Sequence, residues 1–149
     1  YYAQPLTEKN VKVKLSDVSV KDWKTVGMPA EAANAIDGDP QTVWTAKALT
    51  PLVVDMGKAS EVIGFSYAPA QKEDLTGTIY KYNFYVSIDG KNWTKCDASG
   101  EFSNIMHNPV PYFVRFGKKY PARYFKLEPV AEINNKPATT VGEVGILLK

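Results

Sequence analysis

Residues 80–88 alternate between large apolar and polar side chains, and this alternation limits the choice of fold more than any other feature of the chain. A period of two residues predicts a β-strand that buries one face and exposes the other. Asp89-Gly90 follows at once and favours a tight turn, and Trp93–Cys96 fits the returning strand of a hairpin. The predicted buried face consists of Tyr80, Tyr82, Phe84, Val86 and Ile88.

Stretches of the same kind recur along the chain, and Pro, Gly, Asn and Asp separate most of them. The only helix-like stretch is Pro29–Asp37. Many short strands with turns between them predict an all-β fold, an antiparallel β-sandwich or jelly roll. The further predicted strands are Val11–Leu15, Leu52–Asp55, Val62–Tyr67, Tyr112–Phe116, Arg123–Leu127 and Glu143–Leu148.

The composition excludes several classes of protein. The 149 residues suit one domain, and 44% hydrophobic with 23% charged residues is ordinary globular composition. The net charge is +2 and no basic run is longer than Lys118-Lys119, so no nucleic-acid surface is indicated. No apolar stretch reaches the roughly 18–20 residues of a membrane helix. We expect neither nucleic acid nor membrane as a partner.

The chain offers little for catalysis. His107 is the only histidine and Cys96 the only cysteine, and a nucleophile needs a base beside it. We expect Cys96 on a strand as a small buried residue and His107 in a loop, with nothing to pair them. There is no phosphate-binding glycine loop and no dinucleotide fingerprint. A pair of distant carboxylates for glycoside hydrolysis remains open on sequence grounds, but we expect the domain not to be an enzyme.

Oxygen-bearing residues are concentrated in Asn34–Trp44 around a tight glycine turn. Asp37, Asp39 and Thr42 supply two carboxylates and a hydroxyl, and calcium takes six to eight oxygens from such groups and from backbone carbonyls. Two interpretations are open from the residues alone. The segment is either a structural calcium site or an Asp-Gly turn without metal.

Five motifs in order make the chain resemble the coagulation factor 5/8 type C (discoidin-like) domain, in its bacterial branch, carbohydrate-binding module family 32. The resemblance implies a galactose-binding-domain-like jelly roll over residues 11–149, with residues 1–10 leading in from upstream. It also implies an attached glycoside hydrolase, fucosidase- or hexosaminidase-like, and a periplasmic, cell-surface or secreted location. The motifs are Ala35–Trp44, Val54–Gly57, Tyr82–Trp93, Ala122–Leu127 and Gly142–Val144.

The family resemblance adds a set of metal ligands to the loop. Many bacterial members hold a structural calcium there, and matching positions adds a carboxylate from near the C-terminus. Such an ion would join the loop to the last strand and would leave no open catalytic position. The implied calcium ligands are Asn34 through its carbonyl, Asp37, Asp39, Thr42 and Glu143.

The resemblance also places a sugar site in loops at one end of the sandwich. Members that bind galactose commonly have Arg where this chain has Gln71, which puts galactose specificity in doubt. Trp23 is the candidate aromatic platform, with packing under the N-terminal loop as the open alternative, and Trp44 and Trp93 are expected in the core. The candidate loops are 19–28, 45–51, 68–77, 102–112 and 131–140. The candidate ligand-binding residues are Trp23, Gln71, Lys72, Glu73, His107, Asn108 and Asn134.

We therefore expect a non-catalytic carbohydrate-binding module whose partners are glycans and the catalytic domain of the same chain. The expected glycans end in galactose, N-acetylhexosamine or fucose. One alternative is a structural accessory domain without sugar affinity. Another is membrane or protein adhesion, for which Ile105-Met106 and Ala48-Leu49 are the only apolar loop tips.

Overall fold

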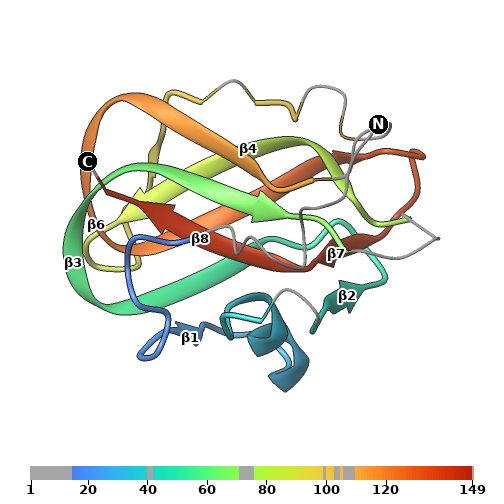
Figure 1. The fold of residues 1–149 in the computed structure, drawn as a ribbon, viewed down its shortest axis with the longest axis horizontal. Helices are drawn as coiled ribbons and strands as arrows, with labels where there is room; N and C mark the ends of the chain where they lie inside the picture. The colour runs from blue at the N-terminus through green and yellow to red at the C-terminus, as the bar shows by residue number, and fades with distance from the viewer. Residues whose placement is uncertain are drawn as a thin grey trace, which may run out of the picture.

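Two long strands, β3 (Leu52–Ala68) and β6 (Tyr112–Glu132), pair antiparallel and form the frame of the domain (Figure 1). The computed structural model describes residues 15–39, 42–70, 76–98, 100–102, 105 and 110–148. Each long strand joins two strands that the sequence predicts separately. The two predicted halves of β3 meet at a shift in its register with β6, between Asp55 and Ser60. Gly57 lies at this place with a φ of 87°, a conformation that favours glycine.

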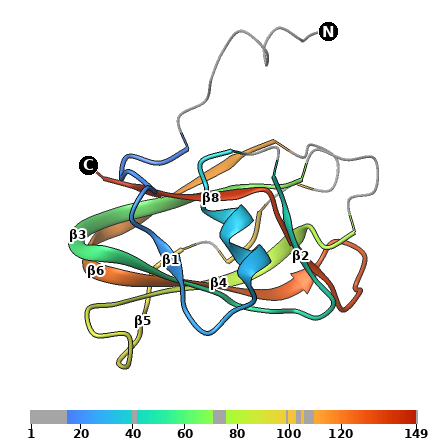
Figure 2. The ribbon, with the colours of Figure 1, turned by 90° about the horizontal axis from the view of Figure 1, so that it is seen from below.

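β3 and β6 turn over at this point, so each one contributes to both layers of a sandwich (Figures 1 and 2). The sheet order is β1-β3-β6-β4-β5, and β8 pairs with the second part of β3. β2 and β7 form a separate two-stranded ladder. This is the predicted antiparallel β-sandwich. The remaining elements are β1 (Lys24–Thr25), the 3-10 helix η1 (Ala30–Ala35), β2 (Trp44–Ala46), β4 (Ile79–Ser87), β5 (Thr94–Lys95), β7 (Thr139–Val141) and β8 (Glu143–Leu147).

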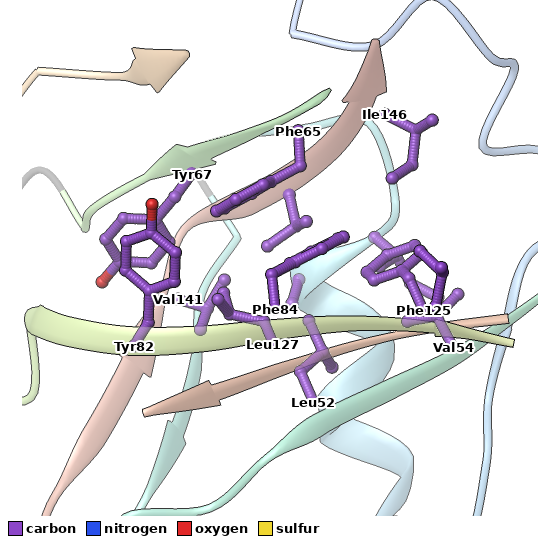
Figure 3. Close-up of a cluster of buried hydrophobic side chains, with 14 of the residues drawn as sticks. Leu52, Val54, Phe65, Tyr67, Tyr82, Phe84, Phe125, Leu127, Val141 and Ile146 are labelled. Atoms are coloured by element: carbon purple, nitrogen blue, oxygen red, sulfur yellow. The ribbon is translucent and has the colours of Figure 1, made fainter. Parts of the chain in front are cut away.

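Aromatic rings from both layers fill the space between them (Figure 3). The ring of Phe65 on β3 stacks on that of Phe84 on β4, with centroids 4.1 Å apart and planes 4° from parallel. Phe125 on β6 stacks on the same Phe84 ring at 5.6 Å. Burial of such large rings supplies much of the free energy that holds the two layers together.

The hairpin predicted after residue 88 is confirmed, since Tyr85 pairs with Lys95 and Val86 with Thr94. Two details of the predicted buried face are wrong. Ile88 lies beyond the end of β4 and is 51% exposed, and Tyr80 is only half-buried because the register with β6 shifts at Lys81.

The three tryptophans have different environments. Trp44 is buried as predicted, with 2% of its surface exposed. Trp93 is not in the core: it is half-buried on the outer face of the sheet, where its ring meets that of Tyr124 edge-on at 6.5 Å. The predicted helix is a single 3-10 segment that packs between β1 and β2 (Figure 2). Within the described residues, no helix has the length and apolar character needed to cross a membrane.

Candidate functional site

The loop between η1 and β2 and the start of β8 lie side by side. Glu143 Oε2 accepts a hydrogen bond from the backbone N–H of Gly38 at 2.8 Å. Asp37 Oδ1 accepts one from the N–H of Asp39 at 2.9 Å, which tightens the turn around Gly38. Gly38 has a φ of 81°, a left-handed conformation that glycine adopts without strain. The turn therefore presents the N–H of Gly38 to the carboxylate at the start of β8.

The hydroxyl of Thr42 lies close to three acceptor oxygens, although it can donate only one hydrogen bond. Its Oγ1 is 2.8 Å from the carbonyl oxygen of Asp39 and 3.3 Å from that of Asn34, and it also contacts Asp37 Oδ2. A hydroxyl has one proton to donate, so at least two of these three oxygens receive no hydrogen from this hydroxyl. The carbonyl oxygen of Asp39 also accepts the backbone N–H of Thr42 at 3.1 Å. Oxygens that converge in this way are ligands of the kind that calcium takes.

Glu143 adds a buried carboxylate to this group of oxygens. The residue is 2% exposed, and its Oε1 is buried without a hydrogen-bond partner among the described residues. Burial, together with the negative charges of Asp37 and Asp39, raises the pKa of this carboxyl to about 8. A buried carboxylate facing other carboxylates is costly unless a cation or a proton neutralises it.

These residues fit calcium, with one difference from the expectation. The described residues bring no three His, Cys, Asp or Glu side chains together as a metal-binding group, so three carboxylate ligands are not found. The Asp39 oxygen that joins the cluster is its backbone carbonyl. Calcium accepts such carbonyl oxygens readily. The oxygens that would hold it belong to Asn34, Asp37, Asp39, Thr42 and Glu143.

Glu143 reaches loop 34–42 because the backbone just before it passes close to the end of β3. Gly142 lies between β7 and β8 and donates its N–H to the carbonyl of Ala68 at 2.8 Å. A Cβ on Gly142 would lie 2.8 Å from that same oxygen and 3.0 Å from the carbonyl oxygen of Pro69. Only glycine allows this close approach of the two backbones. The approach places the start of β8 beside loop 34–42.

The described parts of three candidate sugar loops, residues 45–51, 68–70 with 76–77, and 131–140, meet at one end of the sandwich, at the right of Figure 1. The N–H of Thr50 donates to Thr139 Oγ1 at 2.9 Å, which joins loop 45–51 to β7. The N–H of Thr140 donates to the carbonyl of Gly77 at 2.8 Å, which joins β7 to loop 68–77. A depression of about 420 Å³ opens beside them, lined by Leu49, Val130, Ala131, Glu132, Asn135, Lys136 and Pro137.

Glu132 holds this loop end together. Its side chain is 2% exposed, and its carboxylate accepts hydrogen bonds from the backbone N–H groups of Gly77 at 2.7 Å, Asn134 at 2.7 Å and Lys136 at 2.8 Å. Tyr67 adds a second link, since its hydroxyl donates to the carbonyl of Thr140 at 2.7 Å and accepts from the N–H of Ile79. In the sequence, Glu132 looks like any solvated surface carboxylate. Its place directly before a turn is the only signal that could have revealed it.

The candidate ligand-binding residues divide into three groups. The ring of Trp23 is buried, 7% exposed, and packs edge-on against Phe125 at 5.3 Å, so the structure favours the packing alternative and corrects the platform assignment. Asn134 is exposed in the turn after Glu132. Gln71, Lys72, Glu73, His107 and Asn108 lie outside the described residues.

The apolar loop tips considered for adhesion also differ from expectation. Ile105 is fully buried, at 0% exposed, so it is not a protruding tip, while Leu49 is 38% exposed. Phe113 is 42% exposed on β6 beside half-buried Tyr112, as expected for neighbours on one strand.

The fold is an antiparallel β-sandwich with several loops gathered at one end. The model of the F5/8 type C domain family matches residues 14–144, and the chain belongs to this family. Solved structures with the same fold include family 32 carbohydrate-binding modules of glycoside hydrolases.

One such structure is CpGH89CBM32-5 from Clostridium perfringens in complex with GalNAc-beta-1,3-galactose. It has a TM-score of 0.75 and 22% identity, over 88% of this chain and 99% of that chain. A Bacteroides ovatus protein assigned as an alpha-L-fucosidase has a TM-score of 0.70 and 35% identity, over 100% of this chain and 22% of that one. Galactose oxidase of Gibberella zeae is 29% identical over 143 residues, which cover 88% of this chain and 20% of that protein. The chain spans about a fifth of the length of the curated relatives it matches.

Proposed function

We propose that this domain is a non-catalytic carbohydrate-binding module that brings an attached glycoside hydrolase to glycans. The observation that carries the proposal is membership of the F5/8 type C family together with the convergence of three candidate loops at one end. The match to about a fifth of larger proteins supports an attached enzyme. The alpha-L-fucosidase assignment of the Bacteroides ovatus relative favours a fucosidase- or hexosaminidase-like partner.

The proposed ligands are glycans that end in galactose, N-acetylhexosamine or fucose. The disaccharide GalNAc-beta-1,3-galactose held by the Clostridium perfringens relative supports the first two. Loop residues 45–51, 68–77 and 131–140, including Asn134, would provide the polar groups, since a sugar needs a few fixed donors and acceptors. Gln71 in place of Arg would hold adjacent hydroxyls by amide hydrogen bonds without a positive charge.

The test is an NMR titration of the isolated domain with millimolar galactose, N-acetylgalactosamine, N-acetylglucosamine and fucose. We expect chemical-shift changes at Gly77 and Asn134 but not at Asn92 in the hairpin at the far end. Asn134→Ala should weaken binding, and Asn92→Ala is the matched control. If no saccharide changes the amide spectrum at these concentrations, the binding role fails for the isolated domain.

We also propose that the loop at 34–42 binds a structural calcium ion with Glu143. The oxygens that converge on Thr42 support this assignment, as does Oε1 of Glu143, which is buried without a hydrogen-bond partner among the described residues. The ion would supply positive charge to a buried oxygen cluster and would take no part in catalysis. The proposed location, periplasmic, cell-surface or secreted, fits a module that acts on external glycans.

A structural accessory role is the second candidate. The burial of Trp23 favours it, because a buried ring cannot serve as the candidate aromatic platform for a sugar. In that case the domain would pack on the catalytic domain and show no saccharide-dependent shift. The same NMR titration separates the two roles.

A further inference from the structure

One face of the sandwich carries aromatic rings and amines that no described element covers. The outer sheet face, as we define it, comprises Tyr85 on β4, Trp93 in the hairpin, Lys95 on β5, and Tyr124 and Lys126 on β6. Lys95 is exposed and the other four residues are half-buried. The opposite side of the same strands buries Phe84, Val86, Phe125 and Leu127 against the second layer.

The strand register fixes the arrangement of these groups. Lys126 pairs with Tyr85, and Tyr85 pairs with Lys95, so the three side chains form one row across β6, β4 and β5. Neighbouring strands lie about 4.8 Å apart, which places the Cα atoms of the two lysines about 10 Å from each other. The Nζ of Lys126 lies 4.9 Å from the ring centroid of Tyr85 and 4.6 Å from that of Trp93.

Among the described residues, neither amine on this row has an ion-pair partner. The nearest acid along β6, Glu128, instead accepts hydrogen bonds from Asn83 Nδ2 at 3.0 Å and from the Tyr85 hydroxyl at 3.3 Å. The face therefore offers two positive charges beside aromatic rings, with an oriented amide and phenol next to them.

This combination matches an anionic chain built from rings with apolar faces. Aromatic side chains contact the C–H faces of a sugar ring, and amines bind carboxylates. The outward row of β6 continues from Lys126 through Glu128 to Val130, which lines the depression at the loop end. A long chain held at the loops can thus extend along β6.

We propose that the outer sheet face is a second binding surface, specific for an acidic polysaccharide that carries carboxylates on its sugar rings. The proposal rests on the proposed carbohydrate-binding role and extends it to a ligand class and a second site. Lys126 and Lys95 bind successive carboxylates, while Tyr85 and Trp93 contact the sugar rings. An oligonucleotide is also anionic and stacks on aromatic rings, so it is included in the test.

The experiment is an NMR titration at low salt with a hexamer of galacturonic acid, a neutral galactose hexamer and an oligothymidylate. We expect the acidic hexamer alone to shift the indole N–H of Trp93 and the amides of Tyr85, Lys95 and Lys126. The double variant Lys95→Glu, Lys126→Met should bind it about tenfold more weakly. Lys58→Glu, on the bend of β3, carries the same charge change as Lys95→Glu and should alter binding less than about twofold.

The outcomes separate this proposal from the loop site. Suppose that neutral sugar shifts Gly77 and Asn134 but that the acidic hexamer shifts nothing on the outer sheet face. This result would refute the second binding surface and would leave the proposed sugar site in the loops intact. Shifts on the outer sheet face alone would support the second surface and contradict the loop site. Equal binding of oligothymidylate, or unchanged binding by a double variant with native melting temperature, would also overturn the proposal.

Discussion

The carboxylate of Glu143 accepts the N–H of Gly38 at 2.8 Å across 105 positions of sequence. This bond joins the start of the last strand to the loop that precedes β2. Only one carboxylate oxygen takes part, since Oε1 has no partner among the described residues. A bound cation would give Oε1 of Glu143 a partner. We therefore expect the stability of the domain to depend on a cation at this place.

Removal of calcium should lower the melting temperature. A ligand present at about 100 times its Kd stabilises a protein by about 2.7 kcal/mol, which for a domain of this size corresponds to about 5–10 °C. Differential scanning fluorimetry with EGTA, followed by added calcium, measures the shift. Glu143→Gln should lose the response, whereas Glu128→Gln, a carboxylate distant from the loop, should keep it. An unchanged wild-type melt with no bound metal by elemental analysis contradicts the calcium site.

Glu132→Gln should loosen the loop end. The neutral amide loses the charge-assisted bonds to three backbone N–H groups, and we expect the free energy of unfolding to fall by about 2 kcal/mol. Hydrogen exchange at Gly77, Asn134 and Lys136 should accelerate more than in the core strands. Glu61→Gln, whose side chain is 70% exposed, is the control and should change stability by less than about 0.5 kcal/mol. Equal exchange rates in both variants would refute the role given to Glu132.

Phe65→Ala should destabilise the whole domain. Phe65 is 0% exposed and stacks on Phe84 across the two layers, and removal of such a ring costs about 3–5 kcal/mol. Urea unfolding gives the change in free energy. Phe113→Ala removes the same ring from a position that is 42% exposed and should cost less than about 1 kcal/mol. Similar losses for the two variants would mean that the layers do not meet at Phe65.

The thiol of Cys96 should be nearly inert in the folded protein. Burial, with the nearby charge of Asp97, raises its pKa to about 12. At pH 8 the thiolate fraction falls from roughly a quarter to about one in ten thousand. Reaction with a disulfide reagent should therefore be about a thousandfold slower than in denaturant, and about tenfold faster for each pH unit up to pH 10. A native rate equal to the denatured rate, or a rate independent of pH, contradicts this environment.

Local patterns identify strands well where side chains alternate with burial. Residues 80–88 and the Asp89-Gly90 turn predict β4, the hairpin and the position of β5. The same rules divide β3 and β6 into halves, because Gly57 and the charged residues around each bend look like turns. Whether a strand ends or only bends depends on its pairing partner, and this information is not local.

The candidate metal site is more visible in the sequence than the sugar site. Asp37, Asp39 and Thr42 are close in sequence and indicate either a calcium site or an Asp-Gly turn. The Asn34 carbonyl and Glu143 enter as ligands only through the family resemblance. The expectation that Trp93 lies in the core is wrong, and the role of Glu132 is not visible in the sequence, because both environments depend on long-range packing. One is a buried carboxylate that accepts hydrogen bonds from three backbone amides, and the other is a tryptophan on an outer sheet face. Neither has a distinctive pattern of neighbours in the sequence.

The passage of β3 and β6 through both layers makes the two layers one cooperative unit. Neither layer can peel away as an intact sheet, because two of its central strands continue into the other. Partial opening at the bends would break ladders on both sides at once, so we expect all-or-none unfolding. All-or-none unfolding of this kind leaves no partly opened state in which the long central strands β3 and β6 would be free to pair with another chain.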